Sequence, residues 1–256
     1  MINFTAMQPS LYQPDSAGFK DSVHSMFSSI AHSYDFLNHL FSFNIDKYWR
    51  VVTVHELRDR LVMQDAHEAI HILDLATGTG DLAFEICRQT GVTVTGVDLA
   101  QEMIDVARKK LLKKPVLQLR LQFITGDAEK LSFPDNCFDG VTIGFGIRNF
   151  PGLNRCFAEI MRVLKPGAPL VIIEFSQPKT GIVRAVMTVF NRLLFPVIGR
   201  LLSGHRTAYS YLPVSVACFP YGQVLADKLS DAGFLNVRFK QLSFGIVTVY
   251  SCSARD

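Results

Sequence analysis

The chain has 256 residues, of which 48% are hydrophobic and 19% are charged. This composition supports a sizeable core and excludes wholesale disorder, and the length allows between one and two domains. The net charge of +3 argues against a protein that coats nucleic acid, and no uncharged apolar stretch reaches the roughly 18 residues of a membrane-spanning helix. Five cysteines without a Cys-x-x-Cys pair predict reduced thiols and no metal site.

The first 64 residues predict a leader followed by helices. Residues 1–20 contain Pro9, Pro14 and Gly18 and lack the basic start and apolar core of a signal peptide, so we expect a flexible leader. From 21 to 64, apolar residues recur at three- and four-residue steps, with a break near 42–44. About 45 residues of helix therefore precede the first strand.

From residue 69 onward, strands alternate with helices. Short apolar runs predict strands at 70–75, 92–98, 119–125, 138–144, 170–175, 235–239 and 246–252. Amphipathic stretches predict helices at 81–89, 101–112, 154–164 and 221–232. Such alternation is typical of βαβ units, so we expect an α/β fold whose mostly parallel, seven-stranded sheet is covered on both faces.

The segment 175–226 differs from the rest because it contains no Asp or Glu. Within it, 181–202 is aliphatic and aromatic with one polar stripe, and Pro196 should kink or break the helix. Five Lys or Arg residues between 179 and 206 suit anionic lipid headgroups. The segment is expected either to face a membrane or to pack on protein.

A nucleotide-binding pattern begins at the end of the first predicted strand. Gly78-Thr79-Gly80 follows that strand, and Asp98 ends the next one. Glycine lets backbone approach a ligand closely, and an acid at the second position accepts hydrogen bonds from ribose hydroxyls. The string Gly78-x-Gly80-x-x-Ala83 also satisfies the relaxed dinucleotide fingerprint, so an NAD-dependent oxidoreductase is one hypothesis.

Three features favour S-adenosylmethionine over NAD. Asp74 stands just before the glycine loop, where a carboxylate can meet an ammonium group and would repel a pyrophosphate. Asp127 follows the third strand and could accept a hydrogen bond from an adenine amino group. The string Phe133-Pro134-Asp135 leads into the fourth strand. The alternative is that Asp74 and Asp127 only cap turns or helices.

These strings resemble the class I S-adenosylmethionine-dependent methyltransferases. More specific strings are similar to the UbiE/MenG quinone C-methyltransferases, and the similarity runs from about residue 21 to the C-terminus. The specific strings are Tyr34-Asp35-Phe36-Leu37-Asn38 with Ser42 and Trp49, Phe145-Gly146-Ile147-Arg148-Asn149, Arg162-Val163-Leu164-Lys165-Pro166-Gly167 with Glu174-Phe175-Ser176, and Tyr209-x-Tyr211-Leu212-Pro213-x-Ser215.

The resemblance implies a Rossmann-like class I fold in a single domain over 21–256, with a helical lid at 21–64 and a helical insertion at 179–215 after the fifth strand. It implies that a polyprenylated quinol is methylated on a ring carbon with S-adenosylmethionine, leaving S-adenosylhomocysteine. Demethylmenaquinol is the expected substrate, and a methoxy-polyprenyl-benzoquinol is the alternative. Pattern and resemblance together give a cofactor site of Asp74, Gly78, Thr79, Gly80, Asp98, Asp127, Ala128 and Gly144, the last through backbone only.

Methyl transfer to a ring carbon needs an electron-rich ring. A quinol ring that loses a phenolic proton becomes a still better carbon nucleophile. The reduced quinol is therefore the expected substrate. Arg148, past the fourth strand, is expected to stabilise a phenolate or orient a water, and Tyr34 and Asp35 are expected to fold over the same opening. His24 and His32 are further candidates for proton transfer. The structural alternatives are that Arg148 pairs with a carboxylate and that Tyr34 packs in the lid.

The same considerations predict the partners and the location. We expect a cytoplasmic protein, peripheral at the cytoplasmic face of the membrane, without nucleic acid, and we leave a homo-oligomer open. Two alternatives to the quinol enzyme remain besides the oxidoreductase. One is a membrane-associated scaffold that retains the nucleotide fold without turnover, and the other is a methyltransferase for a sterol or another small phenol.

Overall fold

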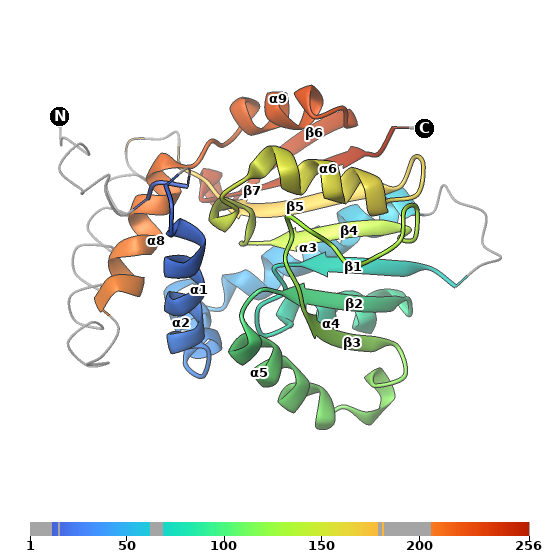
Figure 1. The fold of residues 1–256 in the computed structure, drawn as a ribbon, viewed down its shortest axis with the longest axis horizontal. Helices are drawn as coiled ribbons and strands as arrows, with labels where there is room; N and C mark the ends of the chain where they lie inside the picture. Colours follow the sequence, from blue (N-terminus) through green and yellow to red (C-terminus); the bar gives the residue numbers. More distant parts are fainter. Residues whose placement is uncertain (1–11, 15, 62–68, 179–180, 182–205, 256) are drawn as a thin grey trace.

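A single seven-stranded sheet forms the centre of the protein, as a computed structural model describes it for residues 12–14, 16–61, 69–178, 181 and 206–255 (Figure 1). The strand order is β3-β2-β1-β4-β5-β7-β6, and β7 alone runs antiparallel to its neighbours β5 and β6. The strands are β1 (His71–Leu75), β2 (Thr93–Asp98), β3 (Leu121–Thr125), β4 (Gly140–Gly144), β5 (Pro169–Phe175), β6 (Leu235–Leu242) and β7 (Val247–Ser253). The mostly parallel sheet expected from the sequence is confirmed.

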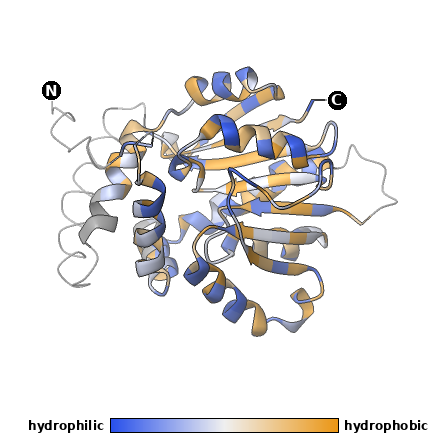
Figure 2. Cartoon of the chain, viewed as in Figure 1, coloured by the Kyte–Doolittle hydropathy of each residue, from blue (hydrophilic) through white to orange (hydrophobic). Residues whose placement is uncertain are grey.

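Helices cover both faces of this sheet (Figure 1). The described helices are α1 (Phe19–Ile30), α2 (Tyr34–Phe41), α3 (Ile45–Leu61), α4 (Asp81–Thr90), α5 (Gln101–Leu112), α6 (Leu153–Val163), α8 (Arg206–Cys218) and α9 (Gln223–Asp231). Alternate side chains of β1 divide between the faces: Ile72 belongs to the apolar cluster that includes residues of α3, α4 and α5, whereas Leu73 and Leu75 belong to the cluster that includes residues of α6 and α9. Apolar residues accordingly dominate the strands between the helical layers (Figure 2).

The carboxyl ends of the parallel strands create the place for a site. β1 lies between β2 and β4, so the chain turns away from it in both directions along the sheet. Loops that leave the carboxyl ends at such a switch point diverge and open a crevice. The helices α1, α2 and α8 gather at this end of the molecule, and α1 packs against both α5 and α8 (Figure 1).

Several expected boundaries differ from those observed. The end of the predicted leader belongs to the fold, because Phe19 is buried at the start of α1 and the Tyr12 hydroxyl donates a hydrogen bond to the Arg148 carbonyl at 2.8 Å. The third strand begins two residues later than expected, after the exposed Leu119. Most of the predicted 179–215 insertion lies outside the described residues, which include only Gly181 and α8.

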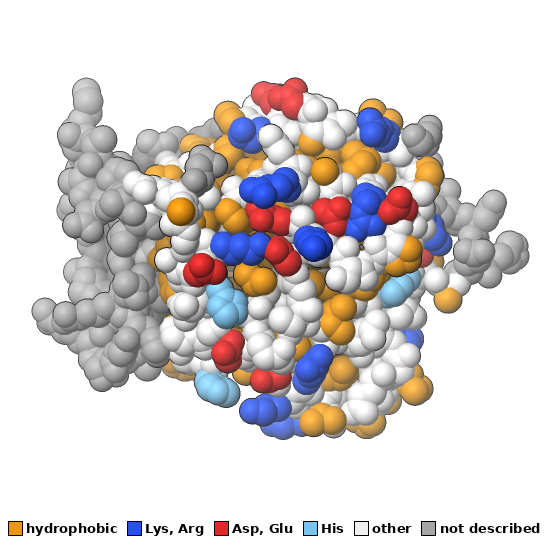
Figure 3. Space-filling model, viewed as in Figure 1, with side chains coloured by type: hydrophobic (Ala, Val, Ile, Leu, Met, Phe, Trp, Pro, Cys, Tyr) orange, Lys and Arg blue, Asp and Glu red, His pale blue; other side chains and the backbone are white. Residues whose placement is uncertain are grey.

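Charges on one face of the molecule are interspersed rather than separated by sign (Figure 3). On α6, Arg162 pairs with both Asp135 and Glu159 at 2.8 Å. This face therefore presents no continuous basic stripe of the kind that tracks a nucleic-acid backbone. Among the helices of the described part of the chain, each is too short or too polar to cross a bilayer.

Candidate active site

The loop after β1 carries the glycines that the sequence singled out. Residues 76–80 lead from β1 into α4, and Ala76, Gly78 and Gly80 all have positive φ. A Cβ on Gly80 would lie 2.5 Å from the Phe123 ring, so this glycine is required by packing beneath the loop. Gly78, by contrast, lines the cavity described below, where its backbone is open to a ligand.

Asp98 joins the end of β2 to this loop. Its two carboxylate oxygens accept hydrogen bonds from the backbone N–H groups of Gly78 at 2.8 Å and Ala100 at 2.9 Å. Burial raises the pKa of Asp98, and these backbone donors oppose that rise by stabilising the charged form. Because each oxygen keeps acceptor capacity and the side chain lines the cavity, Asp98 can receive two hydroxyl donors.

Asp74 occupies a different place from the one expected. Its side chain is 1% exposed, does not line the cavity, and accepts hydrogen bonds from Thr77 and Thr142, both at 2.6 Å. Desolvation raises the pKa of Asp74 to about 6. The carboxylate therefore holds the glycine loop to β4 from beneath, where the sequence had suggested a contact with a ligand's ammonium group.

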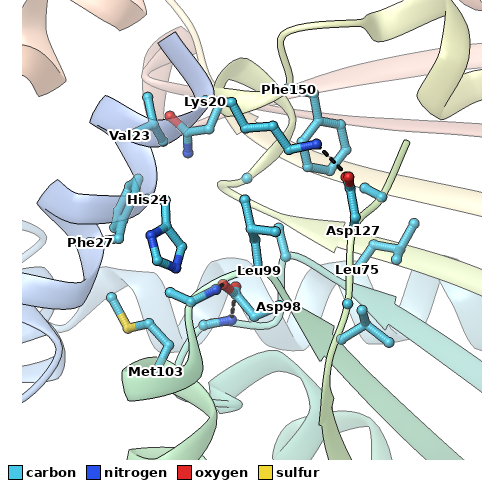
Figure 4. A pocket seen from close by; sticks show the side chains of 18 of the residues that line it. Lys20, Val23, His24, Phe27, Leu75, Asp98, Leu99, Met103, Asp127 and Phe150 are labelled. Atoms are coloured by element: carbon cyan, nitrogen blue, oxygen red, sulfur yellow. Dashed lines mark hydrogen bonds and ion pairs between the residues drawn. The ribbon is translucent and has the colours of Figure 1, made fainter. Parts of the chain in front are cut away.

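A cavity that is open to solvent lies between the carboxyl ends of the strands and the helices α1 and α2, and its space, the open mouth included, is about 800 Å³ (Figure 4). Lys20, Val23, His24 and Phe27 of α1 line one wall and face Asp98 across the cavity, and Met103 lines the wall formed by α5 (Figure 4). Further lining residues are Tyr34, Leu99, Asp127, Ala128, Gly144, Phe145, Gly146, Asn149 and Phe150. Much of the N-terminal helical segment thus closes over the site.

One end of the cavity is bounded by an ion pair between the lid and the loop after β3. The Lys20 ammonium reaches across to the Asp127 carboxylate and lies 3.3 Å from Glu129 Oε2 (Figure 4). The Asp127 carboxylate also accepts the Glu129 N–H at 3.0 Å. Neighbouring carboxylates raise the pKa of Lys20 against the effect of burial. This pair joins α1 to a residue expected to bind adenine.

Arg148 lies behind the cavity wall rather than in it. Its side chain is 4% exposed, and Nη1 donates to Glu174 Oε1 at 2.7 Å and to the Phe145 carbonyl at 2.5 Å. Its guanidinium also stacks over the Phe175 ring, with 5.6 Å to the centroid. Nε is buried and has no hydrogen-bond partner among the described residues. The expected substrate contact is thus replaced by a buried pair that supports the lining residues 145–150.

Asp35 also turns away from the cavity and takes part in a network that fixes α2. It accepts the Thr79 hydroxyl and pairs with Lys110 at 2.8 Å, and Lys110 also contacts Asp81 at 2.6 Å. A second branch links His39 of α2 to Asp46 at 2.8 Å. Arg50 bonds to Asp46 and lies 3.2 Å from Asp81. His39, Asp46 and Asp81 lie close enough together to hold a metal ion. Lys110 and Arg50, however, already supply positive charge to these carboxylates.

The structure brings together part of the expected site. Of the candidate residues, Tyr34, Gly78, Asp98, Asp127, Ala128 and Gly144 line the cavity. Asp74, Thr79, Gly80, Asp35 and Arg148 instead hold the surrounding loops and helices. The sequence does not identify Lys20, Phe27 and Met103 as site residues, although all three line the cavity. The helical period of α1 indicates an apolar face but not the surface that this face covers.

The residues present fit S-adenosylmethionine. Asp98 offers two partly used oxygens, the backbone at Gly78 approaches without a side chain, and Leu99 and Met103 provide an apolar wall. Asp127 lines the same cavity. A ribose, an aromatic base and a thioether-like chain need these kinds of contacts.

The chain matches the model of the ubiE/COQ5 methyltransferase family over residues 16–253. It is 39% identical over 234 residues to a demethylmenaquinone methyltransferase of Bacteroides fragilis, covering 91% of this chain and 92% of the relative. It is 39% identical over 233 residues to a protein of Geobacter sulfurreducens named ubiquinone/menaquinone biosynthesis C-methyltransferase UbiE, covering 90% and 88%.

Solved structures support the fold independently. A methyltransferase in complex with the Haloferax volcanii Trm112 methyltransferase activator aligns with a TM-score of 0.60 and 16% identity. The alignment covers 90% of this chain and 98% of that one. At this level of identity the likeness concerns the Rossmann-like class I fold alone.

Proposed function

The chain belongs to the ubiE/COQ5 methyltransferase family, and on that premise we propose that it methylates a ring carbon of demethylmenaquinol, using S-adenosylmethionine. The family match, which spans nearly the whole chain and includes the lid as well as the sheet, carries this proposal. Relatives named as demethylmenaquinone methyltransferases support the naphthoquinol ring. A methoxy-polyprenyl-benzoquinol is the alternative, since a similar relative carries both pathways in its name.

The cofactor, when bound, supplies a methyl group on a sulfonium, which is a strong electrophile. For this chain, we propose that Asp98 accepts the ribose hydroxyls and that the Gly78 backbone lies along the ligand. Asp127 and Ala128 hold the adenine end, where Lys20 orients the Asp127 carboxylate. Gly144 contributes backbone only.

Aromatic side chains of the lid cover part of the cavity. Phe27 and Tyr34 meet edge to face, with 5.9 Å between ring centroids, and both line the cavity. Gly78 lies against the Tyr34 ring, because a Cβ there would be 3.7 Å from it. We infer that this aromatic cover excludes water and orients the ring carbon, while burial raises the pKa of Tyr34 and keeps its hydroxyl protonated.

Arg148 acts on this site as a positioning residue. Its pair with Glu174 fixes the backbone of 145–150, which contributes Phe145, Gly146 and Asn149 to the cavity. Its positive charge also favours the ionised form of Tyr34, which lines the cavity, and so opposes the rise in the Tyr34 pKa that burial causes. Replacing Arg148 with Ala should lower turnover; normal turnover with normal cofactor binding would remove it from the mechanism.

Labelled methyl transfer tests the proposed function directly. The purified protein is given S-adenosylmethionine with a labelled methyl group and, separately, reduced demethylmenaquinone, a reduced methoxy-polyprenyl-benzoquinone and the oxidised form of each. We expect label on the reduced rings and least on the oxidised ones, with the naphthoquinol preferred. Binding of the cofactor without transfer to any quinol would support a scaffold and overturn the proposal.

The polyprenyl chain also bears on location. We propose that the protein works as a peripheral protein at the cytoplasmic face of the membrane, where its quinol substrate is dissolved. The basic, aliphatic sequence of 179–206, outside the described residues except for Gly181 and the start of α8, supports this contact. Arg192→Glu and Arg200→Glu should weaken binding to anionic vesicles, whereas unchanged binding would indicate that the segment packs on protein.

A further inference from the structure

Large apolar side chains are exposed on two segments that are far apart in the sequence. Five lie on α2, the turn after it and the start of α3, and one lies at the tip of the β6–β7 hairpin: Phe36, Leu40, Phe43, Ile45, Tyr48 and Phe244, called here the apolar rim. Phe36, Tyr48 and Phe244 are 63%, 57% and 82% exposed. Side chains of this size are usually buried, so their exposure together indicates a contact surface.

The two segments of the apolar rim are joined by a direct contact. The Trp49 indole N–H donates a hydrogen bond to the Ser243 hydroxyl at 2.8 Å. Tyr48 is the neighbour of Trp49, and Phe244 is the neighbour of Ser243. Phe244 holds a φ of 59°, a left-handed conformation that costs energy for an aromatic residue.

The end of β5 and the residues that follow it lie beside the hairpin tip of the apolar rim. The Ser176 hydroxyl donates to the Gly245 carbonyl at 2.8 Å, and Gly245 lies against the backbone of Pro178. The described residues up to Pro178 therefore lie beside the hairpin tip. The helix α8, where the described chain continues, packs against α1 (Figure 1).

The charge of the apolar rim suits a lipid surface. Asp46, the only acid between residues 36 and 48, is 3% exposed and bonds inward to Arg50, Ser42 and His39. Residues 243–246 carry no charge, and Lys47 is exposed. Aromatic and aliphatic residues with a basic residue and no exposed acid are typical of segments that lie in the headgroup region.

We propose that the apolar rim docks on a lipid bilayer and holds the cavity at the membrane surface. The inference rests on the proposed function, because a polyprenylated quinol resides in the bilayer. Helix α2 connects surface and site: Tyr34 at its start lines the cavity, whereas Phe36 and Leu40 are exposed. Docking by α2 thus brings the lid and the source of substrate together.

Vesicle co-sedimentation tests the docking. The full chain is mixed with vesicles of phosphatidylcholine alone or of equal parts phosphatidylcholine and phosphatidylglycerol. The variants are Phe36→Ser/Tyr48→Ser and Phe244→Asn, the latter because Asn tolerates the left-handed backbone. We expect the double variant to partition about tenfold less on both vesicles, since apolar burial drives the contact. Phe244→Asn should partition severalfold less than the wild type.

Val116→Ser/Leu119→Ser is the matched control, because both side chains are exposed and apolar but precede the amino end of β3, at the opposite edge of the sheet. It should partition as the wild type does. Unchanged partition of the rim variants, an equal loss in the control, or no partition of the wild type would each overturn the proposal. So would a rim variant that alters the oligomeric state in gel filtration while vesicle binding persists, since a second copy would then be the occupant.

A separate readout distinguishes this proposal from the proposed function. With a short-chain quinol dispersed in buffer, the rim variants should methylate at the wild-type rate, and with long-chain quinol in vesicles they should be slower. If the wild type methylates no quinol, the proposed function fails, yet the partition measurements still decide whether the apolar rim binds lipid. Slower reaction of the variants on both substrates would show a damaged site and contradict the docking role.

Discussion

At the scale of single residues, Asp98 combines a structural and a binding role. Its oxygens hold the backbone of Gly78 and Ala100 and still face the cavity. Asp98→Asn keeps the size but replaces one oxygen with an N–H₂ group that cannot accept. We expect S-adenosylhomocysteine to bind roughly tenfold to a hundredfold more weakly, the usual effect of losing hydrogen bonds to a charged group. Isothermal titration calorimetry measures this.

The control for Asp98 is Asp105→Asn on α5. Asp105 is exposed and receives a hydrogen bond from Gln101 at 2.7 Å, so it has the same chemistry away from the cavity. Its variant should bind the ligand as the wild type does. Equal affinity of Asp98→Asn and wild type would contradict the ribose-binding role.

The buried carboxyl group of Asp74 should make the free energy of unfolding depend on pH. Its carboxyl ionises near 3.8 when unfolded and near 6 when buried, so between these values the folded state binds more protons. The free energy of unfolding must therefore fall as the pH rises through this window, and the loss is nearly complete by about pH 7. Asp74→Asn has no such titration. From about pH 4 to about pH 7, we expect the wild type to lose on the order of 2–3 kcal/mol relative to the variant. Parallel curves in urea unfolding would contradict this.

At the scale of elements, the ion-pair network determines how firmly α2 closes. Lys110 bridges Asp35 on α2 and Asp81 at the start of α4, and these groups are about a quarter exposed. Partly exposed pairs contribute up to about 1 kcal/mol. Lys110→Met should therefore speed hydrogen exchange of the amides of α2 roughly fivefold and leave the central strands unchanged. Lys109→Met, exposed on the same helix, is the control and should exchange as the wild type does.

The elements themselves follow from local sequence, whereas the partners of the site residues do not. The apolar run of β1 and the glycines after it are visible within a ten-residue window. The predicted strands, and the helices predicted between them, begin and end within a few residues of those observed. The Arg148–Glu174 pair joins residues 26 apart, and Thr142 reaches Asp74 across 68 residues. Such contacts are created by strand order, which periodicity does not encode, so a pattern could name Arg148 and Asp74 without revealing that both support the site from behind.

At the scale of the whole molecule, ligand binding should join the lid and the sheet into one unit. The cavity takes its walls from α1, α2 and α5 and from the ends of β1, β2 and β4, so a ligand there contacts every layer that must separate on unfolding. A ligand at a hundred times its dissociation constant stabilises the folded state by about 2.7 kcal/mol. For a chain of this size, that corresponds to a rise of roughly 5–10 °C in the unfolding midpoint.

Differential scanning calorimetry with S-adenosylhomocysteine and with NAD separates the two cofactor classes suggested by Gly78-x-Gly80-x-x-Ala83. Only S-adenosylhomocysteine should raise the midpoint, because Gly80 packs on Phe123 beneath the loop and is not open to a pyrophosphate. The Asp98→Asn variant should show a smaller rise at the same ligand concentration, since its side chain keeps only one accepting oxygen. An equal rise with NAD would support the dinucleotide hypothesis instead, and a full rise in Asp98→Asn would mean that Asp98 does not hold the ligand.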